Sequence, residues 1–245
     1  MSLFSVKNYD VILTGGSRGI GEALLNAFIK EGSNVVMLDV TKPKSSVNYK
    51  YIKCDLSNKK SIYNAINNLN KLDIKPKVLV NCAAITLSEE AIKYKDSDWE
   101  KTISTNLTGT FYLCREIAKI MIKNKTHGSI INYTSISSEV GFENNPSYAA
   151  SKSGVKHLTK ALAVEWGKYN IRVNNISPGY TNTPMNKKSW NDPKLNKIRS
   201  DNTVFNRWAQ PEEMIGPTIF LASEASSYVT GIDLIVDGGW IIKGF

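Results

Sequence analysis

Histidine and cysteine are both scarce in this chain. Its 245 residues include two histidines, His127 and His157, and three cysteines, Cys54, Cys82 and Cys114. Neither histidine has a cysteine or a carboxylate at the spacing of a metal site, so we expect no bound metal and no histidine-based catalysis. Three dispersed cysteines do not suggest a disulfide framework, which favours buried free thiols in a cytoplasmic protein.

Long hydrophobic runs are also missing. No stretch approaches the roughly 18 apolar residues of a membrane-spanning helix. The N-terminal residues lead into a strand-like run without the apolar core of a signal peptide. We therefore expect no membrane partner.

Acidic residues are outnumbered by basic ones. Lysine and arginine total 31 against 22 acidic residues, which gives a formal net charge of +9. Such an excess can attract nucleic acid. The lysines that crowd residues 42–60 alternate with apolar residues, however, and no aromatic stacking platform lies beside them. We interpret them as a solvated surface and expect no nucleic-acid partner.

Short β-branched segments and longer amphipathic stretches alternate along the whole chain. We expect strands within residues 10–16, 34–40, 49–55, 77–83, 128–135 and 171–179, and helices at 20–31, 61–72, 105–124 and 148–169. This alternation predicts an α/β fold, a doubly wound parallel sheet with helices on both faces. One domain, residues 1–245, accommodates all of it. The one long irregular region, 180–207, contains Pro184 and Pro193 and predicts a mobile substrate lid.

The segment TGGSRGIG, residues 14–21, lies between the first predicted strand and the first predicted helix. Its glycines permit a tight turn and let a diphosphate meet the N-terminal amides of the helix. Asp39 ends the next strand, where an acid can bind a ribose 2′-hydroxyl and would repel a 2′-phosphate. Arg18, inside the loop, would instead suit that phosphate. On balance we expect NAD in preference to NADP.

Tyr148 and Lys152 lie four residues apart among small residues in NPSYAASKSG, residues 145–154. On a helix this spacing points both side chains to one face. A neighbouring ammonium favours the phenolate and can lower the pKa of a tyrosine by roughly 1 to 3 units, so the pair could exchange a proton with an alcohol. By itself the pair is more typical of an ordinary tyrosine and a solvated lysine, and other segments have to decide between the two interpretations.

Further motifs follow in order along the chain: CDLS with Asp55, NCAA with Asn81, TNLTGTF with Asn106, INYTSISS with Ser135, YAASK, and SPGYTNTPM. Together with the glycine loop they make the chain similar to the short-chain dehydrogenase/reductase family over essentially its whole length. The resemblance implies a Rossmann-type fold with seven strands. It also implies a catalytic tetrad of Asn106, Ser135, Tyr148 and Lys152.

The resemblance assigns a role to each member of the tetrad. Ser135 would polarise a carbonyl group and Tyr148 would protonate it. Lys152 would lower the pKa of Tyr148 and bind the nicotinamide ribose, while Asn106 would hold a water behind Lys152. Other hydroxyls near Ser135 compete for its role, and its spacing from Tyr148 decides the choice. The implied cofactor contacts are Gly15, Ser17, Arg18, Gly19, Ile20, Gly21, Asp39, Asp55, Leu56, Asn81, Ala83, Tyr148, Lys152, Pro178, Gly179, Thr181 and Thr183.

The chain from Arg207 onward is similar to a bacterial branch that contains gluconate 5-dehydrogenases, polyol dehydrogenases and 3-oxoacyl-carrier-protein reductases. Polar residues before Tyr148 favour a polyol, sugar or sugar acid as substrate. The candidate contacts are Ser137, Glu139, Asn145 and Trp190. One alternative is a 3-oxoacyl thioester reductase whose acidic carrier protein the basic surface would attract. Another is a non-catalytic NAD-binding regulator on the same fold.

The resemblance also implies a homotetramer. One interface would be formed by the predicted helices 105–124 and 148–169. Leu162, Val164 and Trp166 give the second helix more apolar bulk than one sheet-facing stripe requires, and the C-terminal segment VDGGWIIKGF is apolar where a free tail is usually polar. Both features favour contacts with further copies of the chain.

Overall fold

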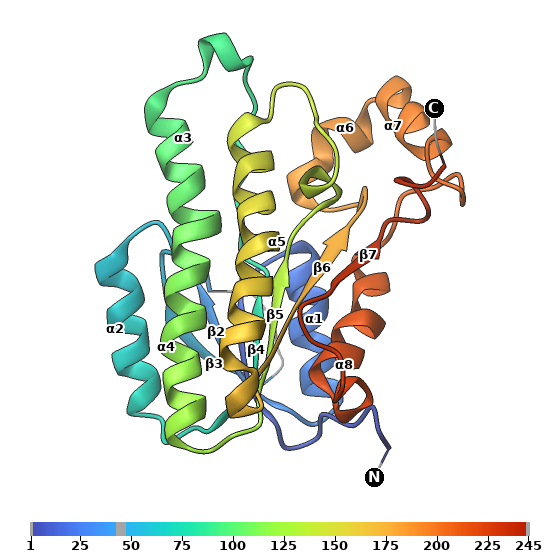
Figure 1. Ribbon diagram of the computed structural model, residues 1–245. Coiled ribbons are helices and arrows are strands. Elements are labelled where there is room, and N and C mark those ends of the chain that lie inside the picture. Colours follow the sequence, from blue (N-terminus) through green and yellow to red (C-terminus); the bar gives the residue numbers. More distant parts are fainter. Residues whose placement is uncertain (1, 43–47, 244–245) are drawn as a thin grey trace.

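The computed structural model describes residues 2–42 and 48–243 and shows one sheet with helices packed on its faces (Figure 1). Part of the lysine-rich stretch, 43–47, and the apolar end, 244–245, lie outside the described residues. Seven parallel strands follow the order β3-β2-β1-β4-β5-β6-β7, which confirms the predicted fold class. They are β1 (Asp10–Thr14), β2 (Asn34–Asp39), β3 (Lys50–Lys53), β4 (Pro76–Asn81), β5 (Ser129–Tyr133), β6 (Arg172–Pro178) and β7 (Asp233–Val236).

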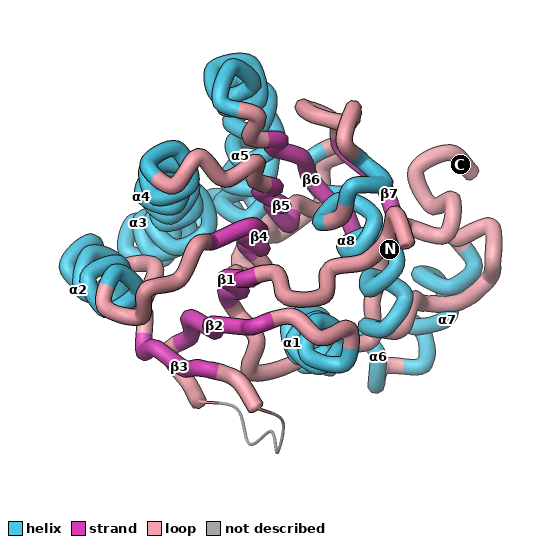
Figure 2. Tube along the Cα trace, turned by 90° about the horizontal axis from the view of Figure 1, so that it is seen from below, coloured by secondary structure: helices cyan, strands magenta, loops and turns pink. Residues whose placement is uncertain are grey.

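Helices cover both faces of this sheet. One face carries α2 (Lys59–Asn70), α4 (Gly109–Lys123) and α5 (Pro146–Trp166), and the other carries α1 (Gly19–Lys30) and α8 (Ile215–Ala222) (Figure 2). Three further helices lie beyond the carboxyl ends of the strands: α3 (Asp96–Ile103), α6 (Lys187–Asn191) and α7 (Pro193–Asp201) (Figure 1). None of the described helices combines the length and the apolar character needed to cross a membrane.

The strands are apolar on both sides because helices cover both faces of the sheet. In β1, Val11 and Leu13 pack with Phe28 of α1, whereas Ile12 between them packs with Ile117 of α4. All five side chains are fully buried. Burial of each such side chain contributes about 1.5–3 kcal/mol, so the strand residues also fix where the helices lie.

The predicted helices occur close to their expected positions. α1 and α2 begin within two residues of the predicted starts at 20 and 61. The helix predicted at 105–124 starts earlier than expected, because α3 continues without a break into a π-helical turn, Ser104–Thr108, and then into α4. The sequence pattern did not predict helices at the positions of α3 and α8.

The strand order of the sheet reverses between β1 and β4. From β1 the chain continues to β2 toward one edge of the sheet, and from β4 it continues to β5 toward the other edge. Thr14 pairs with Asn81 at the ends of these strands. The buried Thr14 hydroxyl accepts the N–H groups of Cys82 and Ala83, each at 3.1 Å. Open parallel sheets bind their ligands at such switch points.

The lid at 180–207 contains helices α6 and α7, so the expectation of an irregular chain is wrong. Pro193 is the first residue of α7, a position where the missing N–H of proline is harmless. Asp192 caps the same helix by accepting the N–H groups of Lys194 and Leu195 at 2.9 and 3.1 Å. The prolines that indicated irregular chain therefore begin helical turns.

Candidate active site

The glycine loop follows β1 at the switch point. Gly15 has a φ of +74°, and a Cβ on it would lie 2.6 Å from Cα of Ala83, so only glycine fits there. α1 then begins at Gly19, and no side chain caps its first amides. Uncapped amides at a helix N-terminus attract anions. The loop therefore fits the diphosphate of a dinucleotide.

Asp39, at the end of β2, faces the same loop. Its side chain is only 8% exposed. One carboxylate oxygen accepts the N–H of Ser17 at 3.1 Å and the other accepts the N–H of Thr41 at 3.0 Å. Arg18 next to Ser17 is exposed. The acid thus has a fixed orientation, while the neighbouring guanidinium is open to solvent.

The other predicted cofactor residues lie near the same edge of the sheet. Pro178 ends β6, and Gly179 donates its N–H to the carbonyl of Val236 at 3.0 Å. Thr183 lies against Gly19: a Cβ atom placed on this glycine would lie 3.3 Å from the Thr183 side chain. The remaining ones lie in the first turn of α1 or in the loops after β1, β3, β4 and β6: Ser17, Ile20, Gly21, Asp55, Leu56, Ala83 and Thr181.

Asn81 is part of a buried chain of hydrogen bonds. Its amide donates to the side-chain oxygen of Asn132 at 2.8 Å and to the Cys114 sulfur at 3.2 Å. Asn132 donates to the Thr159 hydroxyl, which donates to Asn175. The chain joins β4, β5, β6 and α5, so the Asn81 side chain supports the sheet, and its contact with a cofactor stays a prediction.

Lys152 and Tyr148 point to one side of α5, as their spacing predicts. Lys152 is 3% exposed, and its ammonium donates a hydrogen bond to the Tyr133 carbonyl at 2.6 Å. The ammonium lies 5.6 Å from the centre of the Tyr148 ring. Ser135 lies close enough to the Tyr148 phenol to lower its pKa. Three members of the predicted tetrad therefore meet in one place.

The pKa of Tyr148 differs from the sequence-based expectation. Desolvation raises it to about 12, and the nearby Ser135 side chain opposes the shift. The lowering expected from Lys152 is not found, and the Lys152 ammonium donates to the Tyr133 carbonyl. Burial also lowers the pKa of Lys152, from 10.5 to about 8, while Cys82 acts in the opposite direction. The phenol is thus a proton donor throughout the neutral range.

Ser135 is distinguished from its neighbours by the direction of its side chain. Thr134 instead binds the Ile176 carbonyl at 3.0 Å, and Ser138 donates to the Ser135 carbonyl at 2.5 Å. The Ser137 hydroxyl is buried and has no partner among the described residues. These contacts support the choice of Ser135 as the hydroxyl that acts with Tyr148.

Asn106 lies in the π-helical turn before α4. Its side chain accepts the N–H of Ile85 and donates to the Ile85 carbonyl, both at 2.9 Å. It also donates to the Ser151 hydroxyl at 3.1 Å. Asn106 therefore clamps the loop after β4 to the residue preceding Lys152.

A second polar cluster, which the sequence reading missed, lies behind Ser135. Asp233 of β7 accepts hydrogen bonds from Thr134 at 3.1 Å and from Ser177 at 2.8 Å. Its carboxylate also lies 3.6 Å from the Lys156 ammonium, which is paired with Glu139. Burial raises the pKa of Asp233. The sequence feature that could have identified Asp233 is the presence of an acid inside the apolar run GIDLIV. Asp233 joins the start of the loop that carries Ser135 to the carboxyl end of β6.

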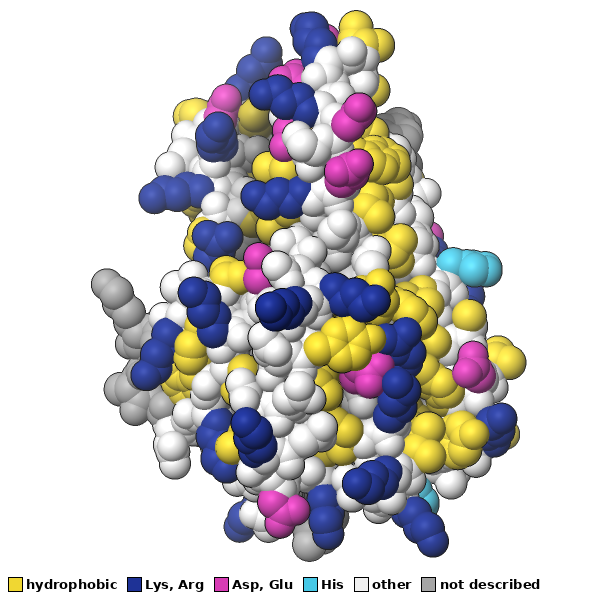
Figure 3. Space-filling view, turned by 90° about the vertical axis from the view of Figure 1, so that its left-hand side faces the viewer, with side chains coloured by type: hydrophobic (Ala, Val, Ile, Leu, Met, Phe, Trp, Pro, Cys, Tyr) yellow, Lys and Arg dark blue, Asp and Glu magenta, His cyan; other side chains and the backbone are white. Residues whose placement is uncertain are grey.

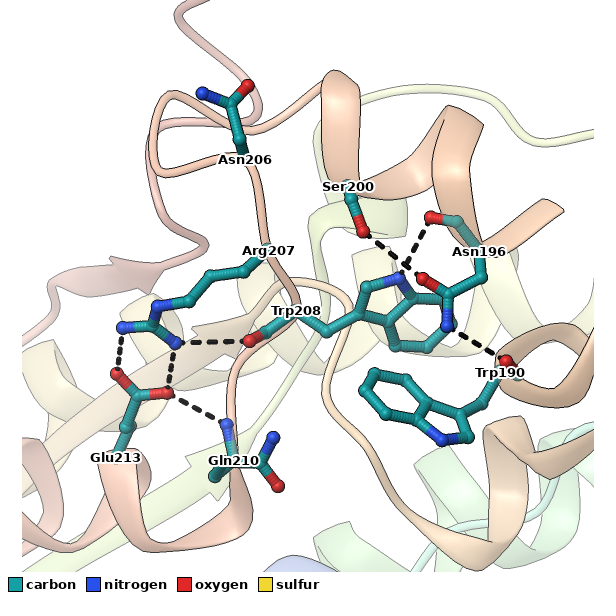
Figure 4. A pocket seen from close by; sticks show the side chains of 8 residues that line it. All are labelled: Trp190, Asn196, Ser200, Asn206, Arg207, Trp208, Gln210 and Glu213. Atoms are coloured by element: carbon teal, nitrogen blue, oxygen red, sulfur yellow. Dashed lines mark hydrogen bonds and ion pairs between the residues drawn. The ribbon is translucent and has the colours of Figure 1, made fainter. Parts of the chain in front are cut away.

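The four predicted substrate contacts are placed differently from one another. Glu139 forms an ion pair with Lys156, and Asn145 accepts a hydrogen bond from Thr86 at 2.9 Å. Trp190 packs edge to face against Trp208, with ring centres 5.4 Å apart. Together with Asn196, Ser200, Arg207 and other residues, this pair lines a cavity of about 600 Å³ under the lid (Figure 4). No member of the tetrad lines that cavity, and contact between Trp190 and the substrate stays a prediction.

Known proteins match this chain over nearly its full length. The family model for enoyl-(acyl carrier protein) reductase covers residues 15–241. The chain is a short-chain dehydrogenase/reductase. It shares 32% identity with a 2-dehydro-3-deoxy-D-gluconate 5-dehydrogenase of Dickeya dadantii, across 99% of each chain. As in its relatives, its activity is that of an NAD(P)-dependent oxidoreductase acting on a secondary alcohol or ketone.

Two solved structures of the family resemble it closely. A 4-hydroxyisoleucine dehydrogenase complexed with NADH has a TM-score of 0.93 and 31% identity, covering 97% of this chain and 100% of that one. A gluconate 5-dehydrogenase of Burkholderia cenocepacia, in complex with NADP and tartrate, has a TM-score of 0.92 and 30% identity, covering 98% of this chain and 97% of that one. Structures of the family therefore hold either nicotinamide cofactor.

The buried ammonium predicts that Lys152→Met stabilises the fold while abolishing turnover. A pKa lowered from 10.5 to about 8 corresponds to a burial penalty of about 3 kcal/mol at pH 7. Loss of the bond to Tyr133 offsets about 1 kcal/mol. We expect a net gain of about 1–2 kcal/mol in unfolding free energy, measured by urea denaturation.

The gain should depend on pH in a defined direction. Between pH 8 and 10.5 the unfolded wild-type chain binds more protons at Lys152 than the folded chain, so wild-type stability rises there and the advantage of Lys152→Met disappears. The exposed Lys160 on the same helix provides the control: Lys160→Met should stay within about 0.5 kcal/mol of wild type. A destabilised Lys152→Met at pH 7 would contradict the burial argument.

Proposed function

We propose that this protein interconverts a secondary alcohol and a ketone on a polyol, sugar or sugar acid, with Tyr148 as the proton-transfer group. The observation that carries the proposal is the meeting of Tyr148, Ser135 and the buried Lys152 in one place, with the Lys152 ammonium 5.6 Å from the centre of the Tyr148 ring. The glycine loop and Asp39 supply a dinucleotide site along the same sheet edge. A regulator that only bound NAD would have no use for a lysine held in the interior.

Each side chain has a separate task in the proposed reaction. When bound, the nicotinamide supplies or accepts the hydride. During reduction, negative charge grows on the substrate oxygen, and the Ser135 hydroxyl stabilises it by hydrogen bonding. Tyr148 transfers its proton to that oxygen. Lys152 provides positive charge next to the resulting phenolate, and Asn106 holds the backbone around Lys152. Oxidation follows the same steps in reverse.

NAD is the cofactor that we propose. Asp39 keeps its carboxylate oriented by the amides of Ser17 and Thr41, and an acid in this position favours a ribose 2′-hydroxyl over a 2′-phosphate. Among related structures, the 4-hydroxyisoleucine dehydrogenase was solved with NADH, whereas the Burkholderia enzyme was solved with NADP. The local charge supports NAD for this chain.

Replacing Tyr148 tests the chemistry. Tyr148→Phe removes only the hydroxyl that carries the proton, so we expect kcat to fall by at least about 100-fold while NAD affinity stays within about threefold. Stopped assays would measure turnover against a panel of polyols, sugar acids and 3-oxoacyl thioesters, and cofactor fluorescence would measure NADH binding. Near-normal turnover of Tyr148→Phe would remove this residue from the mechanism, and a preference for thioesters would favour the acyl reductase alternative.

Replacing Asp39 tests the cofactor preference. Asp39→Asn removes the negative charge but keeps one oxygen acceptor for the loop, and Arg18 can then meet a 2′-phosphate. We expect the ratio of kcat/KM for NADP to kcat/KM for NAD to rise at least about tenfold, equivalent to about 1.4 kcal/mol. Glu22→Gln, which removes an exposed acid from the first turn of α1, should leave the ratio unchanged. Wild-type protein that already prefers NADP would refute the assignment.

We also propose that the protein acts as a homotetramer. Val164 on α5 is 86% exposed, and Phe111 and Tyr112 on α4 are half-buried. Apolar side chains gather over this side of the molecule (Figure 3). Leu162 and Trp166, in contrast, are buried within the subunit, so they do not support the assembly as their bulk suggested.

The assembly predicts a linked loss of activity and stability on dilution, because a neighbouring copy would brace the catalytic helix. Val164→Lys should produce a smaller species in light scattering, with lower thermal stability. Ile92→Lys changes a residue that is 91% exposed and lies far from α5 in sequence, and it should leave the mass unchanged. A fully active wild-type monomer would rule the tetramer out.

A further inference from the structure

Arg199 places a positive charge against the aromatic residues that follow the predicted nicotinamide loop. It belongs to α7 of the lid, and its guanidinium lies 4.6 Å from the centre of the Tyr180 ring and 5.7 Å from that of Trp208. Its positive charge opposes the burial that raises the pKa of the Tyr180 phenol. Tyr180 directly follows Gly179 at the end of β6. The lid therefore brings a cation to the edge of the sheet where the tetrad lies.

The rings around Tyr180 come from several segments that border the active site. Tyr180 lies 6.3 Å from Phe142, 6.1 Å from Trp240 and 5.2 Å from Trp208, measured between ring centres. Phe142 belongs to the loop between Ser135 and Tyr148, and Trp240 follows β7. Aromatic faces of this kind pack against the C–H faces of carbohydrates, so the cluster suits a polyhydroxy chain.

The chain has five arginines, and the described partners divide them into two groups. Three have their guanidinium groups occupied by structural partners: Arg115 by Glu116, Arg207 by Glu213, and Arg172 by backbone carbonyls. Arg18 and Arg199 have neither a carboxylate nor a backbone acceptor among the described residues. Arg18 lies in the glycine loop, whereas Arg199 lies in the lid. Arg199 is therefore the arginine of the lid whose guanidinium is available to a ligand.

The lid around Arg199 is itself strongly basic. Residues 180–207 contain six basic and two acidic side chains, a formal charge of +4 out of the +9 of the whole chain. Both acids are engaged elsewhere, because Asp192 caps α7 and Asp201 pairs with Lys197. The field of the lid thus favours an anion, and no acid of the lid neutralises Arg199.

We propose that Arg199 binds a carboxylate of the substrate, so that the enzyme acts on polyhydroxy acids in preference to neutral polyols or acyl thioesters. A guanidinium stacked on aromatic rings keeps the N–H groups at its edge available, and two of them can bind a carboxylate side by side. This inference rests on the proposed function, because it names the substrate class of the same site.

The test compares aldonates of five and six carbons with the alditols that have the same hydroxyl arrangement. Wild type should favour the acids in kcat/KM. Arg199→Gln should lower kcat/KM for the acids by about 10- to 100-fold, mainly through KM, and leave the alditols within about threefold. Arg199→Lys should restore part of the preference. Lys197→Gln removes the same charge from an exposed site on the same helix and should retain the preference.

Tartrate provides a readout that does not require turnover. Quenching of tryptophan fluorescence, with NAD present, should show tartrate binding to wild type and about tenfold or greater loss of affinity in Arg199→Gln. Equal loss of acids and alditols in Arg199→Gln, or tartrate binding that does not change, would overturn the inference by making Arg199 a lid-packing residue. Failure to turn over any alcohol or ketone would instead refute the proposed function, while the tartrate titration would still decide the role of Arg199.

Discussion

The Lys152 ammonium lies in a part of the protein that nearly excludes water, and the Tyr133 carbonyl is the acceptor that holds it there. A buried ammonium without a partner is strongly unfavourable, so α5 has to adopt one register against β5. A helix advances 1.5 Å per residue, and a slip by one residue would separate both Lys152 from Tyr133 and Tyr148 from Ser135. The buried bond between Asn132 and Thr159 fixes the same register farther along α5.

The loops that carry the reacting groups are held by contacts between strands distant in the sequence. The Thr14 hydroxyl ties the end of β1 to the loop after β4. Asp233 ties the loop after β5 to the carboxyl end of β6 through Thr134 and Ser177. Because each loop is held by hydrogen bonds to the sheet, a ligand can bind on the side of the loop that faces away from the sheet without breaking these bonds. The precision of the site thus derives from the sheet.

Local sequence patterns predicted the parts of this structure that depend on neighbouring residues. The spacing of Tyr148 and Lys152, the glycine loop and the apolar strands are all of this kind, and the fold follows from them. The lid helix was missed because Pro193 begins a helix there and was interpreted as a break. Asp233 and Arg199 were missed because their partners are remote in sequence. The raised pKa of Tyr148 depends on surrounding atoms that no short motif describes.

The two hydrogen bonds of Asp39 connect cofactor choice to the shape of the glycine loop. The same carboxylate that faces the ribose site also holds the amide of Ser17. A substitution that removes this acid to favour NADP therefore also removes the acceptor of the Ser17 amide. A second substitution is then needed to support the loop. Between the two changes lies a variant that serves both cofactors poorly. Cofactor preference and the support of the glycine loop are therefore linked through one side chain.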